Sequence, residues 1–232
     1  MASENSQARL TISNDPAIIT AIERFEVDES RKDDAIQLAV RYITGTWRQQ
    51  EAFIGAALLR GRNHSGISCY AQWRRLTDAF SPDAPPPAWS LAAALAEFPT
   101  VESRIFSTDF IENLSDPTGT ILSFEEAPHL HYGLFSVKPE NQNKVMDLGR
   151  GNSGKLLGMP GLASINWHRS IDGRMINNFG TWQHFDGLQQ MGQQKGFRLG
   201  TTDVYWHGWA DWDNELFDLA AVITREGLSV PG

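Results

Sequence analysis

The sequence has few of the features that mark secreted, membrane or nucleic-acid-binding proteins. It contains one cysteine, Cys69, which excludes an internal disulfide and suits a reducing compartment. No apolar run approaches the roughly 18 residues that span a bilayer, and the N-terminal MASENSQARL lacks the apolar core of a signal peptide. The formal net charge of −8 comes without a basic stripe. We therefore expect a cytoplasmic protein that binds neither nucleic acid nor membrane.

Several catalytic signatures are also missing. The chain has no Gly-x-Ser-x-Gly elbow, and Cys69 has no evident partner, which argues against serine and cysteine hydrolases. It has no His-x-x-x-His pair and no second cysteine, so we expect no metal site. Residues 149–155 satisfy G-x-x-x-x-G-K, but a helix is expected before them, and Leu156 stands where Ser or Thr would bind magnesium. We reject a phosphate-binding loop there and expect a mobile glycine-rich loop over a pocket mouth.

The chain does contain one hairpin pattern twice. Residues 162–182 alternate apolar and polar side chains around an Asp-Gly pair, which is a strong signal for a tight turn between two strands. Residues 53–73 have the same length and also end in Trp. Upstream, AIERFEV (21–27) aligns with HYGLFSV (131–137). The offset of about 110 residues predicts a tandem repeat.

Each copy is predicted to follow the ferredoxin-like order β-α-β-β-α-β, which makes the fold class α+β with two repeats in a dimeric α/β-barrel-like unit. The first copy is expected to contain a strand at 18–27, a helix after Ser30, the hairpin 52–73, an alanine-rich helix at 90–97 and a strand at 101–113. The second is expected to contain a strand at 129–137, a helix from Pro139, the hairpin 162–182, a helix at 184–195 and a strand at 200–209.

A tail follows, in which Leu216, Leu219, Ala220 and Ile223 have helical spacing, so we expect an extra helix that ends at Gly227. The predicted domains are 15–113, 128–212 and a C-terminal helical extension at 213–232.

Asn178 and Trp182 are the strongest candidate site residues. They lie four apart on a predicted strand and therefore share one face. An amide that donates a hydrogen bond beside a large aromatic can hold a phenol or quinone oxygen and stabilise a developing enolate. The first copy has Cys69 and Trp73 at these positions. We therefore expect the second copy to hold the site and the first to be scaffold.

The order of these motifs resembles the antibiotic biosynthesis monooxygenase family of the dimeric α/β-barrel superfamily. The resemblance covers about residues 17–112 and 128–212. It rests on Phe25–Val27 and Phe135–Val137, on Met159-Pro160-Gly161-Leu162, and on Tyr70–Trp73 and Phe179–Trp182. The first copy departs from the pattern, with Glu51-Ala52 in place of Pro-Gly. A two-unit chain resembles in particular the tandem ring-opening oxygenases of angucycline-type aromatic polyketide pathways.

This resemblance implies a monooxygenase or dioxygenase of antibiotic biosynthesis that oxidises or cleaves a ring of a polycyclic phenol or hydroquinone with O2. Asn178 and Trp182 match an Asn–Trp pair that is part of the site in small quinone-forming members, which work without metal. No tightly bound cofactor is expected, because there is no Rossmann fingerprint. Reduced flavin (FAD or FMN) would be a diffusible co-substrate and a flavin reductase a candidate partner. Monomer and homodimer both stay open, and a homodimer is favoured.

A deprotonated hydroquinone can pass an electron to O2 itself, so the protein has to bind the ring, favour the anion, exclude water and orient O2. Asn178 would hold the oxyanion, and His131 or His207 would take the phenolic proton. The residues expected to surround a flat ligand are Trp182, Trp167, Trp206, Tyr205, His129 and His168. A structural role is the alternative for each histidine. Alternative functions are a heme-degrading or cyclase-like enzyme on the same fold and a non-enzymatic module that binds aromatic ligands.

Overall fold

The computed structural model describes residues 7–62, 66–75, 90–113, 115–116, 118–153, 156–193 and 208–231, with 191–193 as backbone only. The strands are β1 (Leu10–Ile12), β2 (Ile18–Phe25), β3 (Phe53–Gly61), β4 (Ile67–Arg74), β5 (Thr100–Asn113), β6 (Thr120–Leu122), β7 (His129–Val137), β8 (Leu162–Ser170), β9 (Met175–Trp182), β10 (Ala210–Thr224) and β11 (Leu228–Ser229). The α-helices are α1 (Lys32–Gly45), α2 (Gln142–Ser153) and α3 (Asp186–Gln193). None of these helices is long and apolar enough to cross a membrane.

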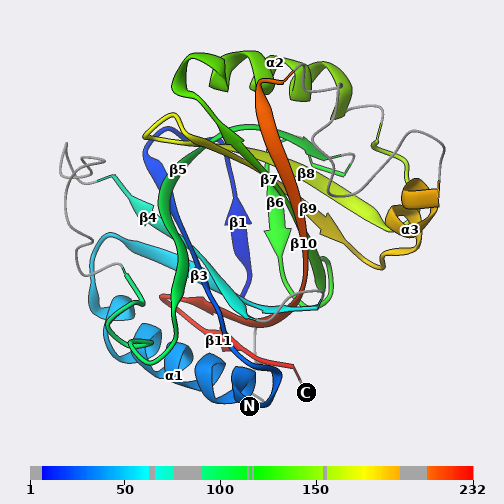
Figure 1. The fold of residues 1–232 in the computed structure, drawn as a ribbon. Helices are drawn as coiled ribbons and strands as arrows, with labels where there is room; N and C mark the ends of the chain where they lie inside the picture. The colour runs from blue at the N-terminus through cyan, green and yellow to red at the C-terminus, as the bar shows by residue number, and fades with distance from the viewer. Residues whose placement is uncertain are drawn as a thin grey trace.

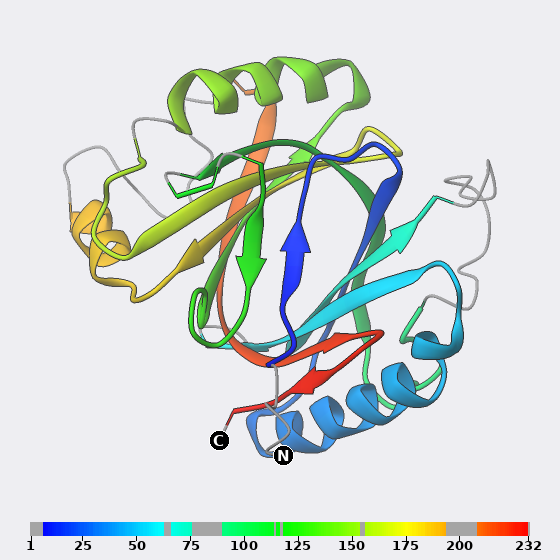
Figure 2. The same cartoon turned by 180° about the vertical axis from the view of Figure 1, so that it is seen from behind.

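Eight of the strands form a closed antiparallel barrel. Their order is β10-β3-β4-β2-β5-β8-β9-β7, and β7 pairs with β10 to close the ring. Helix α1 covers one side of the barrel, and α2 and α3 cover the opposite side (Figures 1 and 2). The short strands β1 and β6 pair with each other, and their apolar residues pack against the cluster that fills the barrel interior.

The two predicted hairpins are confirmed, and their registers are alike. Phe53 pairs with Trp73 in β3–β4, and Leu162 pairs with Trp182 in β8–β9. In each case a register shift follows directly, before Gly55 in one hairpin and before Ser164 in the other. The Asp-Gly turn is also as predicted, with Gly173 at φ 75°. The α+β class is therefore confirmed.

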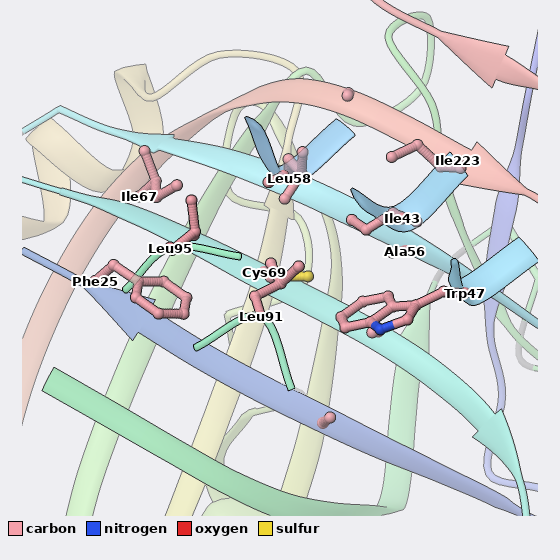
Figure 3. Close-up of a cluster of buried hydrophobic side chains, with 14 of the residues drawn as sticks. Phe25, Ile43, Trp47, Ala56, Leu58, Ile67, Cys69, Leu91, Leu95 and Ile223 are labelled. Atoms are coloured by element: carbon pink, nitrogen blue, oxygen red, sulfur yellow. The ribbon is translucent and has the colours of Figure 1, made fainter. Parts of the chain in front are cut away.

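Alternate residues of the barrel strands face the interior or the outside of the barrel, as the period of two requires, and the helices cover part of the outside. One apolar cluster fills the barrel, a second lies between the sheet and α1, and a third lies between the sheet and α2. Figure 3 shows the second cluster, with Trp47, Cys69, Leu91 and Leu95 packed together between the helix and the strands.

The alanine-rich segment at 90–97 is a series of turns, so the predicted helix is wrong. The Ser90 hydroxyl and the Leu91 amide donate hydrogen bonds of 2.6 and 2.7 Å to the Glu23 carboxylate on β2. Burial raises the pKa of Glu23 although these donors oppose the shift. Long-range contacts to a buried side chain thus override the helix propensity of alanine, which is a weak preference.

The C-terminal helix that was predicted to end at Gly227 is also wrong, because its apolar residues belong to β10, which begins at Ala210 and ends at Thr224. This strand pairs with β7 along its first part and with β3 along its second part. The register shifts between Leu219 and Ala221, so odd-numbered and even-numbered residues exchange faces at this point of the strand. The apolar residues on the two sides of the shift therefore have a spacing that resembles that of a helix. The predicted boundary between 212 and 213 therefore falls inside this strand. Residues 200–207 of the strand predicted at 200–209 lie outside the described part of the chain.

The glycine-rich stretch that was predicted as a loop belongs to α2 as far as Ser153, and Gly154 and Lys155 lie outside the described residues. Gly149 has a packing role there. A Cβ at this position would lie 2.6 Å from the Trp167 ring, which is stacked between Phe110 and Phe135 at 5.6 Å from each. A Cβ on Gly151 would meet nothing within 4 Å. The first glycine thus lets α2 approach the sheet.

We expect Gly149→Ala to destabilise the fold by about 1–3 kcal/mol, because the stacked indole cannot yield to the added methyl group. Gly151→Ala on the same helix is the matched control and should stabilise by about 0.5–1 kcal/mol, because alanine restricts the unfolded chain. Urea denaturation measures both. Equal stability of the two variants would contradict the close contact between α2 and Trp167.

Candidate functional site

A pocket lies on the side of the barrel that carries α2 and α3. Its empty volume of about 290 Å3 includes space that is open to solvent. Its lining residues are His131, Leu156, Met159, Leu162, Ile165, Asn178, Gly180, Trp182 and Leu188. Three residues singled out from the sequence, the Asn–Trp pair and one of the two candidate bases, thus meet in one mostly apolar pocket.

Strand register explains why these residues meet. His131 on β7 is paired with Gly180 on β9, and Asn178 and Trp182 lie two residues to either side of that glycine. A Cβ on Gly180 would lie 3.2 Å from His131 Nδ1 and 3.0 Å from Trp182 Nε1. The glycine therefore lets the imidazole and the indole N–H approach each other over the sheet. Sequence reasoning missed Gly180, although a glycine inside a strand is itself a signal of close approach.

His131 is only 8% exposed. Burial lowers its pKa to about 4, against a hydrogen bond with the Asn214 side chain that favours the charged form. The imidazole is therefore neutral at pH 7 and can accept a proton. Asn214, on the neighbouring strand β10, is a second site residue that sequence reasoning missed, because it was assigned to a helix.

Two buried polar atoms of the pocket have no hydrogen-bond partner among the described residues, His131 Nε2 and Trp182 Nε1. The indole N–H groups of Trp47, Trp73 and Trp167 also lack a partner, but an unpartnered atom at a pocket is within reach of water or a polar ligand. The partly buried Asn178 adds an amide that can donate or accept. The pocket therefore offers an acceptor, a donor and an amide to a ligand that is otherwise apolar.

The outer wall of the pocket is made by residues 159–162 and by the start of α3, and these two segments pack closely. Gly161 has φ 84°, and a Cβ there would lie 2.3 Å from the His184 carbonyl oxygen, so the position requires glycine. The Gln183 amide donates to the Gly161 carbonyl at 2.7 Å, and the Gly187 amide donates to the Pro160 carbonyl at 3.1 Å. These contacts give the Met-Pro-Gly-Leu segment its structural role.

Two other predicted site residues lie near the pocket without lining it. The His129 Nδ1 atom is 2.7 Å from Asp218 Oδ1, and the His129 ring centroid is 5.2 Å from that of Phe185. Trp167 packs under α2 between two phenylalanines and is 2% exposed. Tyr205, Trp206 and His207 lie outside the described residues.

His168 is on the other face of the sheet, inside the barrel, and so is not brought to the pocket. Its Nδ1 lies 3.2 Å from the Asn166 carbonyl oxygen, and its Nε2 lies 3.0 Å from the Tyr70 hydroxyl. Because a carbonyl only accepts, Nδ1 carries the proton and Nε2 accepts the Tyr70 hydroxyl hydrogen. Burial lowers the pKa of His168 to about 4. This histidine joins β4 to β8 across the barrel.

The corresponding place in the first half is filled. By strand register, Ala21 and Ala71 replace His131 and Gly180, and Cys69 replaces Asn178. The apolar cluster of Figure 3 occupies this layer, with Trp47 and the turn residues Leu91 and Leu95 covering Cys69. The first half therefore lacks both the polar site residues of the second half and the open space of its pocket.

The described lining of the pocket lacks the groups that usually hold nucleotide phosphates. None of its described lining residues is cationic, whereas the phosphates of a flavin nucleotide are usually held by Arg, Lys or helix N-termini. Within the described ranges, no three His, Cys, Asp or Glu side chains gather in a way that could hold a metal ion.

No protein-family model and no curated protein matches the sequence. Solved structures do match. A protein described as anthrone oxidase-like superposes with a TM-score of 0.69 at 13% identity, over 94% of this chain and 98% of that chain. A candidate monooxygenase from Fusobacterium nucleatum gives a TM-score of 0.58 at 10% identity, over 90% of this chain and 94% of that chain. A similar protein from Lactobacillus acidophilus gives 0.54 at 11% identity, over 93% and 100%. These likenesses show the fold.

Proposed function

We propose that the chain is an oxygenase that oxidises an electron-rich polycyclic phenol or hydroquinone with O2 in the pocket over β7, β8 and β9. The observation that carries this proposal is the convergence of a neutral imidazole, an amide and an unpartnered indole N–H in one apolar pocket. The fold likeness to an anthrone oxidase-like protein supports the same substrate class, because anthrone is the tautomer of a tricyclic phenol.

The oxidation of anthrone needs no reductant, and reduced flavin is proposed only for ring cleavage. His131 takes the phenolic proton, and Asn178 donates a hydrogen bond to the resulting oxyanion. The anion then gives electrons to O2. With anthrone, one oxygen atom replaces the two hydrogens of the ring CH2 group as a new carbonyl, and the other oxygen leaves with those hydrogens as water. The apolar wall that includes Trp182 and Leu188 excludes bulk water and fixes the ring.

The finer parts of this proposal are the pathway and the architecture. We assign the substrate to aromatic polyketide biosynthesis of the angucycline type, with ring cleavage as one outcome, reduced flavin as a diffusible co-substrate and a flavin reductase and a second copy of the chain as partners. We also propose that the two halves arose by tandem duplication. The orders β3-β4-β2-β5 and β8-β9-β7-β10 and the matching hairpin registers support the duplication.

The test is O2 uptake with anthrone, with and without reduced flavin. We expect uptake by the wild type and a loss of about 10²-fold or more in kcat/KM for Asn178→Ala, the range found when one donor to an oxyanion is removed. Asn177→Ala is the matched control, because this neighbour is fully buried on the barrel side of the same strand. Turnover without O2 would favour a cyclase-like enzyme, and tight binding without turnover a binding module. Either result would overturn the oxygenase.

A further inference from the structure

Arg62, directly after β3 in the first half of the chain, contacts Phe185 beside the pocket of the second half. The Arg62 backbone amide donates to the Leu216 carbonyl at 2.8 Å. Its Nε lies 2.9 Å from Asp218 Oδ2, so the side chain is anchored on β10. Its guanidinium carbon lies 5.4 Å from the centroid of the Phe185 ring. Arg62 therefore places a cation on an aromatic ring of the other half.

Phe185 is held from a second direction by the same carboxylate. Asp218 Oδ1 is 2.7 Å from His129 Nδ1, and the His129 ring lies 5.2 Å from Phe185 at an interplanar angle of 34°. Asp218 thus orients both the guanidinium and the imidazole that contact the ring. Phe185 is 7% exposed, although Arg62 and Asp218 are themselves partly exposed.

Phe185 in turn determines where the pocket wall lies. Its ring centroid is 6.1 Å from that of Trp182, whose indole lines the pocket. It directly precedes α3, and its carbonyl accepts the Gln189 amide at 3.0 Å in the first turn of that helix. Leu188 of the same turn also lines the pocket. A displacement of Phe185 would therefore move both the indole and the helix that cover the site.

We propose that Arg62 is a positioning residue for the pocket: it holds Phe185 against Trp182 and so controls access of a ring-shaped ligand to Asn178. In this case the first half supplies a functional contact to the second and is more than scaffold. The interaction is at the surface, so its loss should affect the position of the wall and leave global stability nearly unchanged. This inference deepens the proposed function. The kinetic test below rests on the proposed function, and the labelling test does not.

The test places a thiol in the pocket by Asn178→Cys, which restores the residue type that the first half has at this position, Cys69. Cys69 is fully buried and should not react. The rate of labelling by an aromatic disulfide such as 5,5′-dithiobis(2-nitrobenzoate) then reports access to the pocket. In this background we expect Arg62→Gln to raise the rate by about two- to fivefold, the factor that an exposed cation–π contact corresponds to.

Arg60→Gln is the matched control, since Arg60 lies two residues earlier, on β3, and pairs with Glu29 and Asp33, away from the pocket. It should label like the parent. Phe185→Leu should raise the rate at least as much, because it also removes the ring contacts with His129 and Trp182. Adding Arg62→Gln to Phe185→Leu should have no further effect, because the ring that Arg62 contacts is already gone. Equal rates for the Arg62 and Arg60 variants, or additive effects of the Arg62 and Phe185 changes, would overturn the proposal.

With Asn178 intact and anthrone as substrate, Arg62→Gln should raise KM and leave kcat nearly unchanged, since Arg62 touches the wall and not the reacting atoms. A fall in kcat with KM unchanged would overturn a positioning role. If anthrone is not oxidised by the wild type, the oxygenase proposal fails, and the labelling result still decides the role of Arg62.

Discussion

Replacing His131 with Gln is expected to lower kcat/KM for O2-dependent oxidation of anthrone by about 10²-fold, the lower end of the range for a positioned general base, because a pKa of about 4 makes the imidazole a weak base. Gln fills similar space and can keep a hydrogen bond to Asn214, so the pocket should persist. It cannot accept a proton near neutral pH, whereas the wild-type imidazole is neutral because burial holds its pKa at about 4. Stopped-flow or oxygen-electrode kinetics measure the loss.

The pH profile separates a base from a packing role. In the wild type, kcat/KM should rise as the pH increases through about 4, where His131 loses its proton, and the His131→Gln variant should lack this limb. Circular dichroism at each pH shows where both proteins are folded, and the kcat/KM values are compared only there. Full activity in the variant would refute His131 as the base and make His207 the next candidate.

The second large effect is a loss of stability in acid. Burial lowers the pKa of both His131 and His168 to about 4, from 6.5 in the unfolded chain. Between these values the unfolded state binds protons that the folded state does not, so the contribution of each histidine is complete above pH 6.5 and is lost as the pH falls toward 4. Each histidine should lower the free energy of unfolding by about 2 kcal/mol between pH 7 and pH 5.

Urea denaturation at pH 7 and pH 5 tests this for His168, which the proposed reaction does not use. His168→Gln should remove about 2 kcal/mol of the wild-type loss, because a neutral amide can still donate to Asn166 and accept from Tyr70. His184→Gln is the matched control, as that histidine is exposed. A wild-type pH dependence in His168→Gln would show that this histidine is not held neutral.

The contribution of Glu23 to stability depends on pH in the opposite direction. Its raised pKa adds stability below pH 4.5, and this stability is lost as the pH rises through the raised pKa of the folded state.

The sequence by itself determined the local parts of this protein. The period of two placed Asn178 and Trp182 on one face of β9, and the Asp-Gly pair determined the turn before it, because both are properties of neighbouring residues. The equal spacing of the two Trp-terminated hairpins likewise predicted their equal registers. The α+β class followed from the order of these elements.

Only the tertiary structure decided the rest, because it depends on contacts between distant residues. Closure of the barrel pairs β10 with β7 and β3, and this pairing, with a shift of register, turned a helix-like pattern into a strand. Burial of Glu23 decided the turns at 90–97. Parity showed which residues share a face, but the placement of α2 and α3 decided that His131 lines a pocket while His168 lies inside the barrel.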